Sequence, residues 1–494
     1  VEGGGLENRF PVFRNGGSNP SPSAILSRLS AGLWLAALAV VIFPGQARAR
    51  QAEDPVALVK AYLDAPDAPG RAAAAARIVR HPEYRPSRLS GWLHRAWPYP
   101  DLRPGTVSIE APLGDGGSRR VHILVPDGYR PDRAWPLIYA LHPSGAKGLE
   151  WANSVRGFLG ARAGEFVIAA PDDYRQNYIA AGPPFTPEHP AILDAVARAA
   201  HVDADRVYAF GYSMGGFGAW FVALYYADRL AGAVSFSAGF DMAVDDGAFW
   251  KQVVRNVAHV PVYNAWGERD ALVARGLDER PAGTFAEQNR RFARAILGMG
   301  LPVTNVEVPG GTHSELAPPA GPMLAVLGSR RAHAPKRVAH AFRHLHQASA
   351  YWLEGLTWVG DRWAEERPAL LPAGEAEPER RVLARTLEPL LGRLTGRIDG
   401  QTIRIARRHI GDAVVWFSDR TVRWDKPVRI EMDGAVVFEG PVARDPGVAL
   451  ARAVATMDFD RLRWAGIRVD AAGRAAPVTA EGLPRPAWKP AGAP

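Results

Sequence analysis

Three residues whose side chains together can activate a hydroxyl nucleophile lie in short glycine-containing segments of this chain. Ser213 lies in the segment Gly-Tyr-Ser-Met-Gly (211–215), Asp270 ends Trp-Gly-Glu-Arg-Asp (266–270), and His313 lies in Gly-Gly-Thr-His-Ser (310–314). A serine hydroxyl is a poor nucleophile at neutral pH, so a neutral imidazole must accept its proton during attack. A carboxylate can hold that imidazole in the required tautomer and stabilise the imidazolium that forms. The three residue types therefore point to nucleophilic catalysis at Ser213.

The segment around Ser213 has the pattern of a sharp turn between a buried strand and a helix. Residues 207–210 are apolar without alternation, as expected for a parallel strand buried on both faces. Gly211 and Gly215 carry no side chains that would collide in such a turn, and a helix is predicted over 219–228. The free N–H groups at a helix N-terminus would stabilise negative charge at the serine. For the pentapeptide alone, an ordinary glycine-rich loop is the competing interpretation.

Eight short strand-like segments, most of them separated by helical stretches, predict the sheet that positions these residues. They span 107–110, 120–125, 136–141, 166–170, 207–210, 232–236, 262–266 and 304–308. This alternation predicts an α/β fold with a mostly parallel sheet covered by helices on both faces and an antiparallel first hairpin. Ser213, Asp270 and His313 each follow the end of a predicted strand.

The three motifs, in the order serine, acid, histidine, resemble the α/β-hydrolase family over about residues 106–316. The resemblance implies an eight-stranded α/β-hydrolase sheet and a triad of Ser213, His313 and Asp270, with no metal or organic cofactor. Asp241, after the sixth strand, is the rival acid because some hydrolases place the acid there. The turn after the seventh strand favours Asp270. An ordinary loop histidine, one of thirteen in the chain, is the competing interpretation of His313.

The resemblance also implies an oxyanion hole made of two backbone N–H groups. One is expected from Met214 and the other from the loop after the third strand, Leu-His-Pro-Ser-Gly (141–145). Pro143 stands where the family usually has glycine, and proline has no N–H group to donate. Either Ser144 or Gly145 must therefore supply the second donor. His142 either braces this loop or has a purely structural place.

Three aromatic residues near these motifs are candidates for substrate binding. Trp151, Tyr174 and Phe217 follow the oxyanion loop, the fourth strand and the serine turn, with core packing as the alternative for each. His340, His344 and His346 suggest a metal site, but no carboxylate motif accompanies them, so a structural explanation is favoured.

Composition limits the number of domains and the classes of partner. The chain has 494 residues, of which 47% are hydrophobic, so two folded units are expected. It contains no cysteine, which excludes disulfides, thiolate metal sites and a cysteine nucleophile. The net charge of +8 is spread along the chain without a dense basic run and interleaved aromatics. A nucleic-acid partner is therefore not expected.

The N-terminal region has the pattern of a secretory signal. Arg28 precedes the apolar segment 31–43, which is followed by Pro-Gly and then Ala-Arg-Ala at 47–49. The apolar segment is short for a membrane span of ~20 residues, so an uncleaved anchor is the weaker alternative. We expect a leader and signal peptide over 1–49, cleavage after Ala49, and a secreted or periplasmic protein. A helical arm that packs on the main domain is predicted over 50–105.

The C-terminal part, beyond the catalytic domain predicted over 106–330, has the pattern of a small β-rich module over 331–480. A proline- and glutamate-rich linker (366–379) and a helical stretch (383–394) precede several predicted strands. The third and fourth of these strands are joined by Asp433-Gly434, a strong hairpin signal. A disordered tail is predicted over 481–494. The module resembles those appended to secreted bacterial esterases of the polyester depolymerase and feruloyl esterase kinds.

The combined pattern predicts a serine hydrolase that cleaves carboxylic esters, either small or polymer-linked, through an acyl-enzyme. A peptidase of the prolyl-oligopeptidase type is one alternative, although the ~55 residues before Thr106 are too few for a propeller. The other alternative is a hydrolase-like binding protein whose module attaches to the cell envelope or a polysaccharide. Trp416 and Trp424 are its candidate exposed aromatics, with core packing as their competing use.

Overall fold

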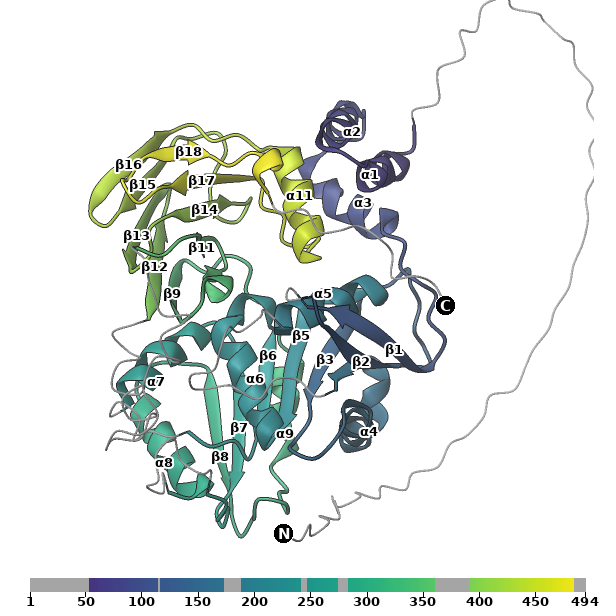
Figure 1. Cartoon of the computed structure of the whole chain (residues 1–494), viewed down its shortest axis with the longest axis vertical. Coiled ribbons are helices and arrows are strands. Elements are labelled where there is room, and N and C mark those ends of the chain that lie inside the picture. Colours follow the sequence, from purple (N-terminus) through teal and green to yellow (C-terminus); the bar gives the residue numbers. More distant parts are fainter. Residues whose placement is uncertain are drawn as a thin grey trace, which may run out of the picture.

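The computed structural model describes residues 53–113, 116–172, 188–240, 247–273, 283–359 and 391–483. An α/β domain (105–327) lies below a β-rich module (337–483), and three N-terminal helices lie beside the module (Figure 1). The predicted leader, the apolar segment 31–43 and the linker 366–379 are outside the described residues. Within the described ranges, every helix is too short or too polar to span a bilayer.

An eight-stranded sheet forms the centre of the α/β domain, as predicted. Its order is β1-β2-β4-β3-β5-β6-β7-β8. β2 pairs antiparallel with β1, which confirms the predicted hairpin, and also with β4, whereas the remaining pairs are parallel. The strands are β1 (Gly105–Pro112), β2 (Ser118–Val125), β3 (Trp135–Leu141), β4 (Val167–Pro171), β5 (Val202–Tyr212), β6 (Gly232–Phe236), β7 (Val262–Gly267) and β8 (Val303–Val308).

Helices cover both faces of this sheet, which explains the unbroken apolar runs of its central strands. In β3, Leu137 and Tyr139 pack in the core on one face, whereas Ile138 packs in the core on the other. The first core includes residues from α5 (Glu188–Ala199), α6 (Met214–Tyr225), α7 (Ala248–Val253) and α8 (Phe285–Ile296). The second includes residues from α4 (Gly148–Leu159) and α9 (Ala320–Leu327).

Helix α6 begins at Met214, five residues before the predicted start at Ala219. The predicted start was wrong because glycine has a low intrinsic helix propensity, so the glycine-rich residues 215–218 were not expected to be helical. Tertiary packing overrides that propensity here. A Cβ atom on Gly216 would lie 2.6 Å from the Phe236 carbonyl oxygen, so the glycines let α6 lie close to the strands.

The C-terminal module consists of two five-stranded sheets, with orders β10-β11-β14-β17-β18 and β16-β15-β13-β12-β9, whose buried side chains share one core. Asp433 and Gly434 adopt φ angles of 52° and 87°, which confirms the predicted hairpin turn. The elements are β9 (Arg337–Phe342), β10 (Ser349–Ala350), β11 (Leu353–Gly355), β12 (Gly392–Asp399), β13 (Thr402–Arg408), β14 (Ala413–Phe417), β15 (Val428–Met432), β16 (Ala435–Gly440), α11 (Pro446–Thr456), β17 (Ala465–Val469) and β18 (Ala475–Pro477).

Two predictions at the ends of the module need correction. The helix predicted over 383–394 is wrong at its end, because Gly392 begins β12, which pairs with strands on both sides. These tertiary pairings override the local pattern, and 383–390 lie outside the described residues. The start of the tail predicted at 481 is wrong, because Ala480–Gly482 form a short 3-10 helix, and 484–494 lie outside the described residues.

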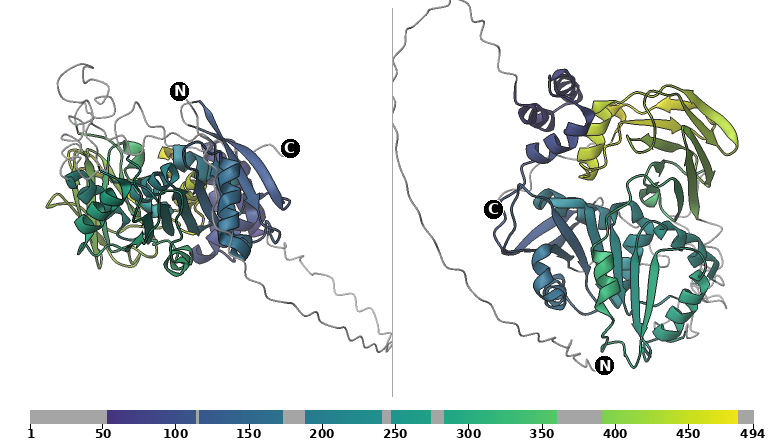
Figure 2. Two further views of the ribbon diagram at one scale, coloured as in Figure 1. Left: turned by 90° about the horizontal axis from the view of Figure 1, so that it is seen from below. Right: turned by 180° about the vertical axis from the view of Figure 1, so that it is seen from behind.

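The predicted N-terminal arm is helical, but most of its buried face packs on the module. Its helices are α1 (Pro55–Asp64), α2 (Ala68–Arg80) and α3 (Leu89–Ala96). Apolar residues such as Leu58, Ile78 and Trp92 share a core with Leu450 of α11, and Figures 1 and 2 show these helices beside α11. The arm meets the α/β domain at its C-terminal end, where His94 Nδ1 of α3 lies 3.0 Å from His201 Nε2 and Tyr99 stacks on the same ring at 3.9 Å. The expectation that the arm packs on the main domain is corrected accordingly.

Candidate active site

Ser213 lies in a strained turn between β5 and α6. Its φ and ψ angles are 53° and −117°, which non-glycine residues rarely adopt. A Cβ atom on Gly211 would lie 1.8 Å from the Gly215 carbonyl oxygen, and one on Gly215 would lie 1.8 Å from the Leu141 carbonyl oxygen. The two glycines of the motif are therefore required by close backbone approach. The Ser213 amide donates to the Phe236 carbonyl at 2.8 Å and fixes the turn against β6.

His313 lies between Ser213 and Asp270 within hydrogen-bonding distance of both. Its Nε2 is 2.9 Å from Ser213 Oγ, and its Nδ1 is 2.9 Å from Asp270 Oδ2. The Asp270 side chain is 0% exposed, whereas that of His313 is 21% exposed. The structure thus brings together the three residues that the motifs singled out. Asp241, the rival acid, lies outside the described residues.

The loops that carry Asp270 and His313 are joined through their backbones. A Cβ atom on Gly267 would lie 2.4 Å from the Gly311 carbonyl oxygen, so the two loops approach each other closely. The Arg269 amide donates to the Gly311 carbonyl at 2.8 Å, and the Gly310 amide donates to Glu268 Oε2 at 2.8 Å. These contacts set the separation between the carboxylate and the imidazole.

Tyr212, next to the serine, contacts the same histidine and was not singled out in the sequence. Its hydroxyl donates to the His313 carbonyl, and the two rings lie 5.5 Å apart. Burial, together with the nearby negative charge of Asp270, raises the pKa of Tyr212 to about 12, so it remains a phenol donor at neutral pH. Ser237 Oγ lies 3.5 Å from the same carbonyl oxygen. Only its place within the serine motif could have drawn attention to Tyr212.

A buried amide network holds α8 against the sheet next to the Asp270 loop. Asn264 Nδ2 of β7 donates to Asn289 Oδ1 of α8 at 3.0 Å and to Asn305 Oδ1 of β8 at 3.1 Å. At the start of α8, the Ala286 amide donates to the Asp270 carbonyl at 3.2 Å. Because these asparagines are far apart in the sequence, no local pattern could have revealed them.

The predicted oxyanion loop lies beside the first residue of α6. Ser144 Oγ is 3.4 Å from Met214 Sδ, and Gly145 adopts a φ angle of 82°. His142 is buried and its Nδ1 lies 2.8 Å from the Pro143 carbonyl oxygen, which favours a bracing role. The arrangement keeps the amides of Ser144 and Gly145 as the two alternatives for the second donor.

The three aromatic candidates for substrate binding have different outcomes. Trp151 is only 5% exposed and stacks on Tyr212 at 6.0 Å, so core packing explains its place. Phe217 is half-buried and contacts Phe285 edge to face at 5.7 Å. Because Phe285 in turn lies 5.5 Å from the His313 ring, Phe217 remains a candidate. Tyr174 lies outside the described residues.

The histidines that suggested a metal have structural surroundings. His340 is buried in β9 with Nε2 near the Gln347 carbonyl, and His344 stacks on His346 at 5.3 Å. Burial lowers the pKa of His344 to about 3 and that of His346 to about 4. Among the described residues, no group of three histidine, cysteine, aspartate or glutamate side chains could hold a metal ion.

Comparison with known proteins gives one family match. The family model described as "Putative esterase" matches residues 188–315, a segment that contains Ser213, Asp270 and His313. A search of curated protein sequences finds no match.

Several solved structures are similar to parts of this chain. A thermostable esterase is 20% identical with a TM-score of 0.32, over 42% of this chain and 55% of that chain, so the match spans about half of its length. A ferulic acid esterase is 16% identical with a TM-score of 0.33, and the match covers 43% of this chain and 92% of that chain. Dipeptidyl peptidase 4 of Porphyromonas gingivalis is 14% identical with a TM-score of 0.33, and the match covers 44% of this chain and 33% of that chain. These TM-scores are all below 0.5, and the function proposed below therefore rests on the residues of the site.

Proposed function

We propose that this protein is a serine hydrolase that cleaves carboxylic esters through an acyl-enzyme. The observation that supports this most strongly is the chain of two 2.9 Å contacts from Ser213 through His313 to Asp270, built on a strained strand-to-helix turn. The family match over the same segment favours an ester as the substrate.

In the proposed acylation step, Ser213 Oγ attacks the ester carbonyl carbon while its proton passes to His313 Nε2. The imidazolium is stabilised by Asp270, which is fully buried and accepts from Nδ1–H. The tetrahedral intermediate then collapses, and the leaving alkoxide takes the proton from Nε2. A water molecule, deprotonated by His313, attacks the acyl group and releases the acid and the free serine.

The negative charge of the tetrahedral intermediate requires two preorganised donors. The Met214 amide is the first donor of α6, where the helix N-terminus adds a favourable partial positive charge. The amide of Ser144 or Gly145 is proposed as the second donor, because Ser144 lies against Met214. A loss of one such donor typically lowers kcat by ~10²- to 10³-fold.

A comparison of matched substrates tests this proposal. The purified protein and its Ser213→Ala variant are assayed on p-nitrophenyl esters from acetate to decanoate and on a matched peptide anilide. We expect ester turnover that disappears in the variant, with a chain-length optimum that reports the size of the acyl site. Cleavage of the anilide alone would replace the esterase with a peptidase.

The peptidase and binding alternatives have less support from the described residues. For the peptidase alternative, the family model that matches the segment around Ser213 is described as an esterase. Trp416, a proposed binding aromatic, is 2% exposed and donates to Glu354 at 2.7 Å, so it belongs to the core. Trp424 is half-buried, with its indole N–H on Asp419 and Arg444 over its ring.

We further propose that the protein is secreted or periplasmic and acts on small or polymer-linked esters. The basic, apolar and small-residue pattern over 28–49 supports export, because it matches a cleavable signal. N-terminal sequencing of protein recovered outside the cytoplasm should begin at Arg50. A start upstream of the apolar segment would contradict cleavage after Ala49.

A further inference from the structure

A cavity of about 240 Å³ lies between the α/β domain and the C-terminal module, far from Ser213. Its lining includes Val202 and Val207 of β5, whereas Ser213 follows the last residue of that strand. At ~3.3 Å per strand residue, six residues separate Val207 from Ser213 by ~20 Å. The cavity is therefore distinct from the candidate active site.

The charged residues of this cavity are predominantly cationic. Five arginines line it, Arg229, Arg331, Arg452, Arg461 and Arg463, against three carboxylates, Asp228, Glu354 and Asp458. His346 also lines it, but burial lowers its pKa to about 4, so it is neutral at pH 7. Charged side chains buried together are expected to be paired, so the partners of each arginine decide whether any of them keeps an unbalanced positive charge.

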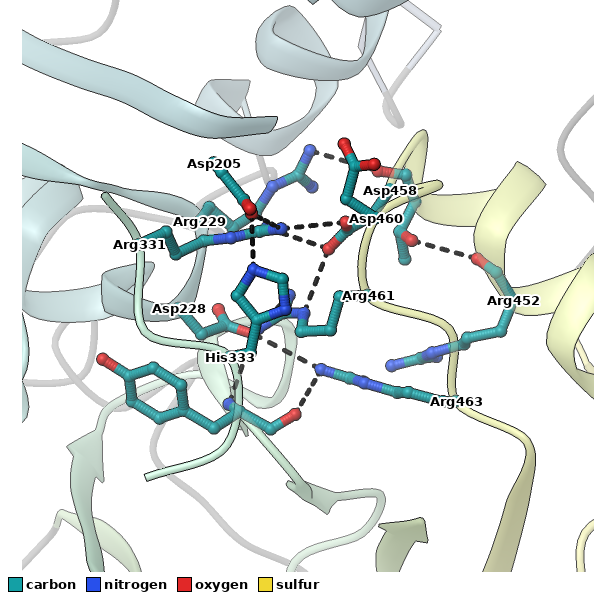
Figure 3. Close-up of polar contacts among 12 residues, drawn as sticks. Asp205, Asp228, Arg229, Arg331, His333, Arg452, Asp458, Asp460, Arg461 and Arg463 are labelled. Atoms are coloured by element: carbon teal, nitrogen blue, oxygen red, sulfur yellow. Dashed lines mark hydrogen bonds and ion pairs between the residues drawn. The ribbon is translucent and has the colours of Figure 1, made fainter. Parts of the chain in front are cut away.

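Two of the arginines are neutralised from outside the cavity lining. Arg229 pairs with Asp194, and Arg331 pairs with Asp205 at 2.9 Å as well as with Asp458. The arginines of the module also have partners, since Arg452 Nη2 lies 2.7 Å from Glu354 Oε2 and Arg461 Nε lies 3.0 Å from Asp458 Oδ2. The weakest of these pairings is that of Arg463, whose contact with Asp228 is the longest at 3.5 Å. Figure 3 shows Arg452, Arg461 and Arg463 on the module side, opposite Asp228 and Arg331.

Arg461 and Arg463 share the carboxylate of Asp228. The Arg461 Nη2 is 3.1 Å from Asp228 Oδ2, and the Arg463 Nη2 is 3.5 Å from the same oxygen. Arg463 also donates to the neutral Tyr351 carbonyl. Burial, together with the positive charges of Arg461 and Arg452, lowers the pKa of Arg463 to about 9. One carboxylate thus leaves Arg463 incompletely neutralised.

Some N–H groups of these arginines are buried without a hydrogen-bond partner. Within the described ranges they are Nη1 of Arg461, Nε of Arg452 and Nε of Arg331. The Arg461 side chain is only 9% exposed, and that of Arg331 is 2% exposed. Buried polar groups almost always have partners, so unfilled donors around a cavity indicate a ligand that accepts hydrogen bonds. The cavity volume equals that of about eight water molecules, which leaves room for a small ion.

We propose that this cavity binds a tetrahedral oxyanion, either inorganic phosphate or the phosphate group of a small ester, through Arg461, Arg463 and Arg452. The guanidinium fork matches the oxygen geometry of phosphate, and several converging arginines favour a divalent over a monovalent anion. Arg331, which follows the last helix of the α/β domain, also has an unfilled N–H group, so an anion held by the module arginines and Arg331 together would link the two structural parts. It would therefore stabilise their contact.

Thermal unfolding and calorimetry of the full chain test this proposal. The ligands are inorganic phosphate, glycerol 2-phosphate, acetate and chloride, each at pH 7 and at the same ionic strength. We expect a saturable rise in Tm of several degrees with phosphate, and none with chloride or acetate, because only a ligand of the native state shifts unfolding. A larger response to glycerol 2-phosphate than to phosphate would assign the site to phosphate esters. Equal responses to phosphate and chloride would overturn the proposal.

Two variants and a matched control locate the effect. Arg463→Gln should weaken phosphate binding more than tenfold and leave the Tm without phosphate at least as high, because it removes an incompletely neutralised buried cation. Arg463→Lys keeps the charge but loses the fork, and should weaken binding several-fold even if the Gln variant does not fold. Arg420→Gln, at an exposed arginine of the module, should respond to phosphate as the unmodified chain does. An undiminished phosphate response in Arg463→Lys and Arg463→Gln would overturn the proposal and leave a purely structural ion-pair cluster.

Discussion

Tyr212→Phe removes one hydroxyl that positions the candidate catalytic histidine. The Tyr212 hydroxyl donates to the His313 carbonyl, and the loop of His313 is otherwise joined to the Asp270 loop. Tyr208 provides a matched control on the same strand, because its buried hydroxyl donates to the Ser329 carbonyl at 2.6 Å. Burial raises the pKa of both phenols to about 12.

The two substitutions should have similar effects on stability and different effects on catalysis. Loss of one hydrogen bond between neutral groups costs about 0.5–1.5 kcal/mol of unfolding free energy in each variant. In Tyr212→Phe, Ser237 Oγ at 3.5 Å remains as a weak partner of the His313 carbonyl. If about 1 kcal/mol of that loss appears in the placement of His313, kcat falls about fivefold. The KM should change little, because no contact to substrate is removed.

The assay compares kcat and KM of both variants on the best p-nitrophenyl ester, with unfolding in urea measured in parallel. We expect equal losses of stability and a reduced kcat in Tyr212→Phe alone, with Tyr208→Phe within about twofold of the unmodified protein. Equal kcat values for the two variants would refute the positioning role of Tyr212.

Three further predictions follow from the site and the core. Asp270→Asn should lower kcat by about 10⁴-fold, because the amide favours the wrong imidazole tautomer. Its circular dichroism spectrum and its unfolding should stay near those of the unmodified protein. A loss of activity below about tenfold would contradict the role of Asp270 in orienting His313. Gly215→Ala should lower Tm strongly or prevent folding, because its Cβ atom would lie 1.8 Å from the Leu141 carbonyl oxygen. The control Gly157→Ala, in an open position of α4, should raise stability by up to about 1 kcal/mol. Similar Tm values for the two variants would be evidence against the close approach at Gly215. Burial lowers the pKa of His189 and His344 to about 3 in the folded protein, below the value near 6.5 expected in the unfolded chain. Their contribution to the unfolding free energy is therefore complete above pH 6.5 and is lost as the pH falls toward 3, by about 1.4 kcal/mol per pH unit for each histidine. Urea unfolding that shows no such decline in unfolding free energy between pH 7 and 4.5 would argue against two buried neutral histidines.

The sequence predicted the features that depend on local pattern and on strict steric demands. The eight strands of the α/β domain were found from short apolar segments, and the serine, acid and histidine segments were found from glycines that backbone contact now explains. At Gly211, Gly215 and Gly267 a side chain would collide with backbone atoms, so a local signal existed. The hairpin at Asp433-Gly434 was predictable for a related reason, since both residues adopt a positive φ.

The features that depend on contacts between distant segments could not be predicted. The N-terminal helices pack mainly on α11, nearly 400 residues later in the chain, and their own pattern shows only that one face is buried. Gly392 begins a strand because β9 and β13 pair with it on both sides. Trp151 is in the core beneath Tyr212, and aromatic residues near a motif look the same in sequence whether they line a pocket or a core. The asparagines that hold α8 likewise meet only in the folded chain.

The most direct test of the proposed function is covalent trapping of the nucleophile. The protein is treated with a fluorophosphonate, residual ester hydrolysis is followed, and the modified residue is identified by peptide mass spectrometry. We predict one phosphonyl group on Ser213, appearing in step with the loss of activity and abolished by Ser213→Ala. Loss of activity with modification of another residue, or full ester hydrolysis by a protein that carries the label on Ser213, would contradict the assignment of Ser213 as the nucleophile.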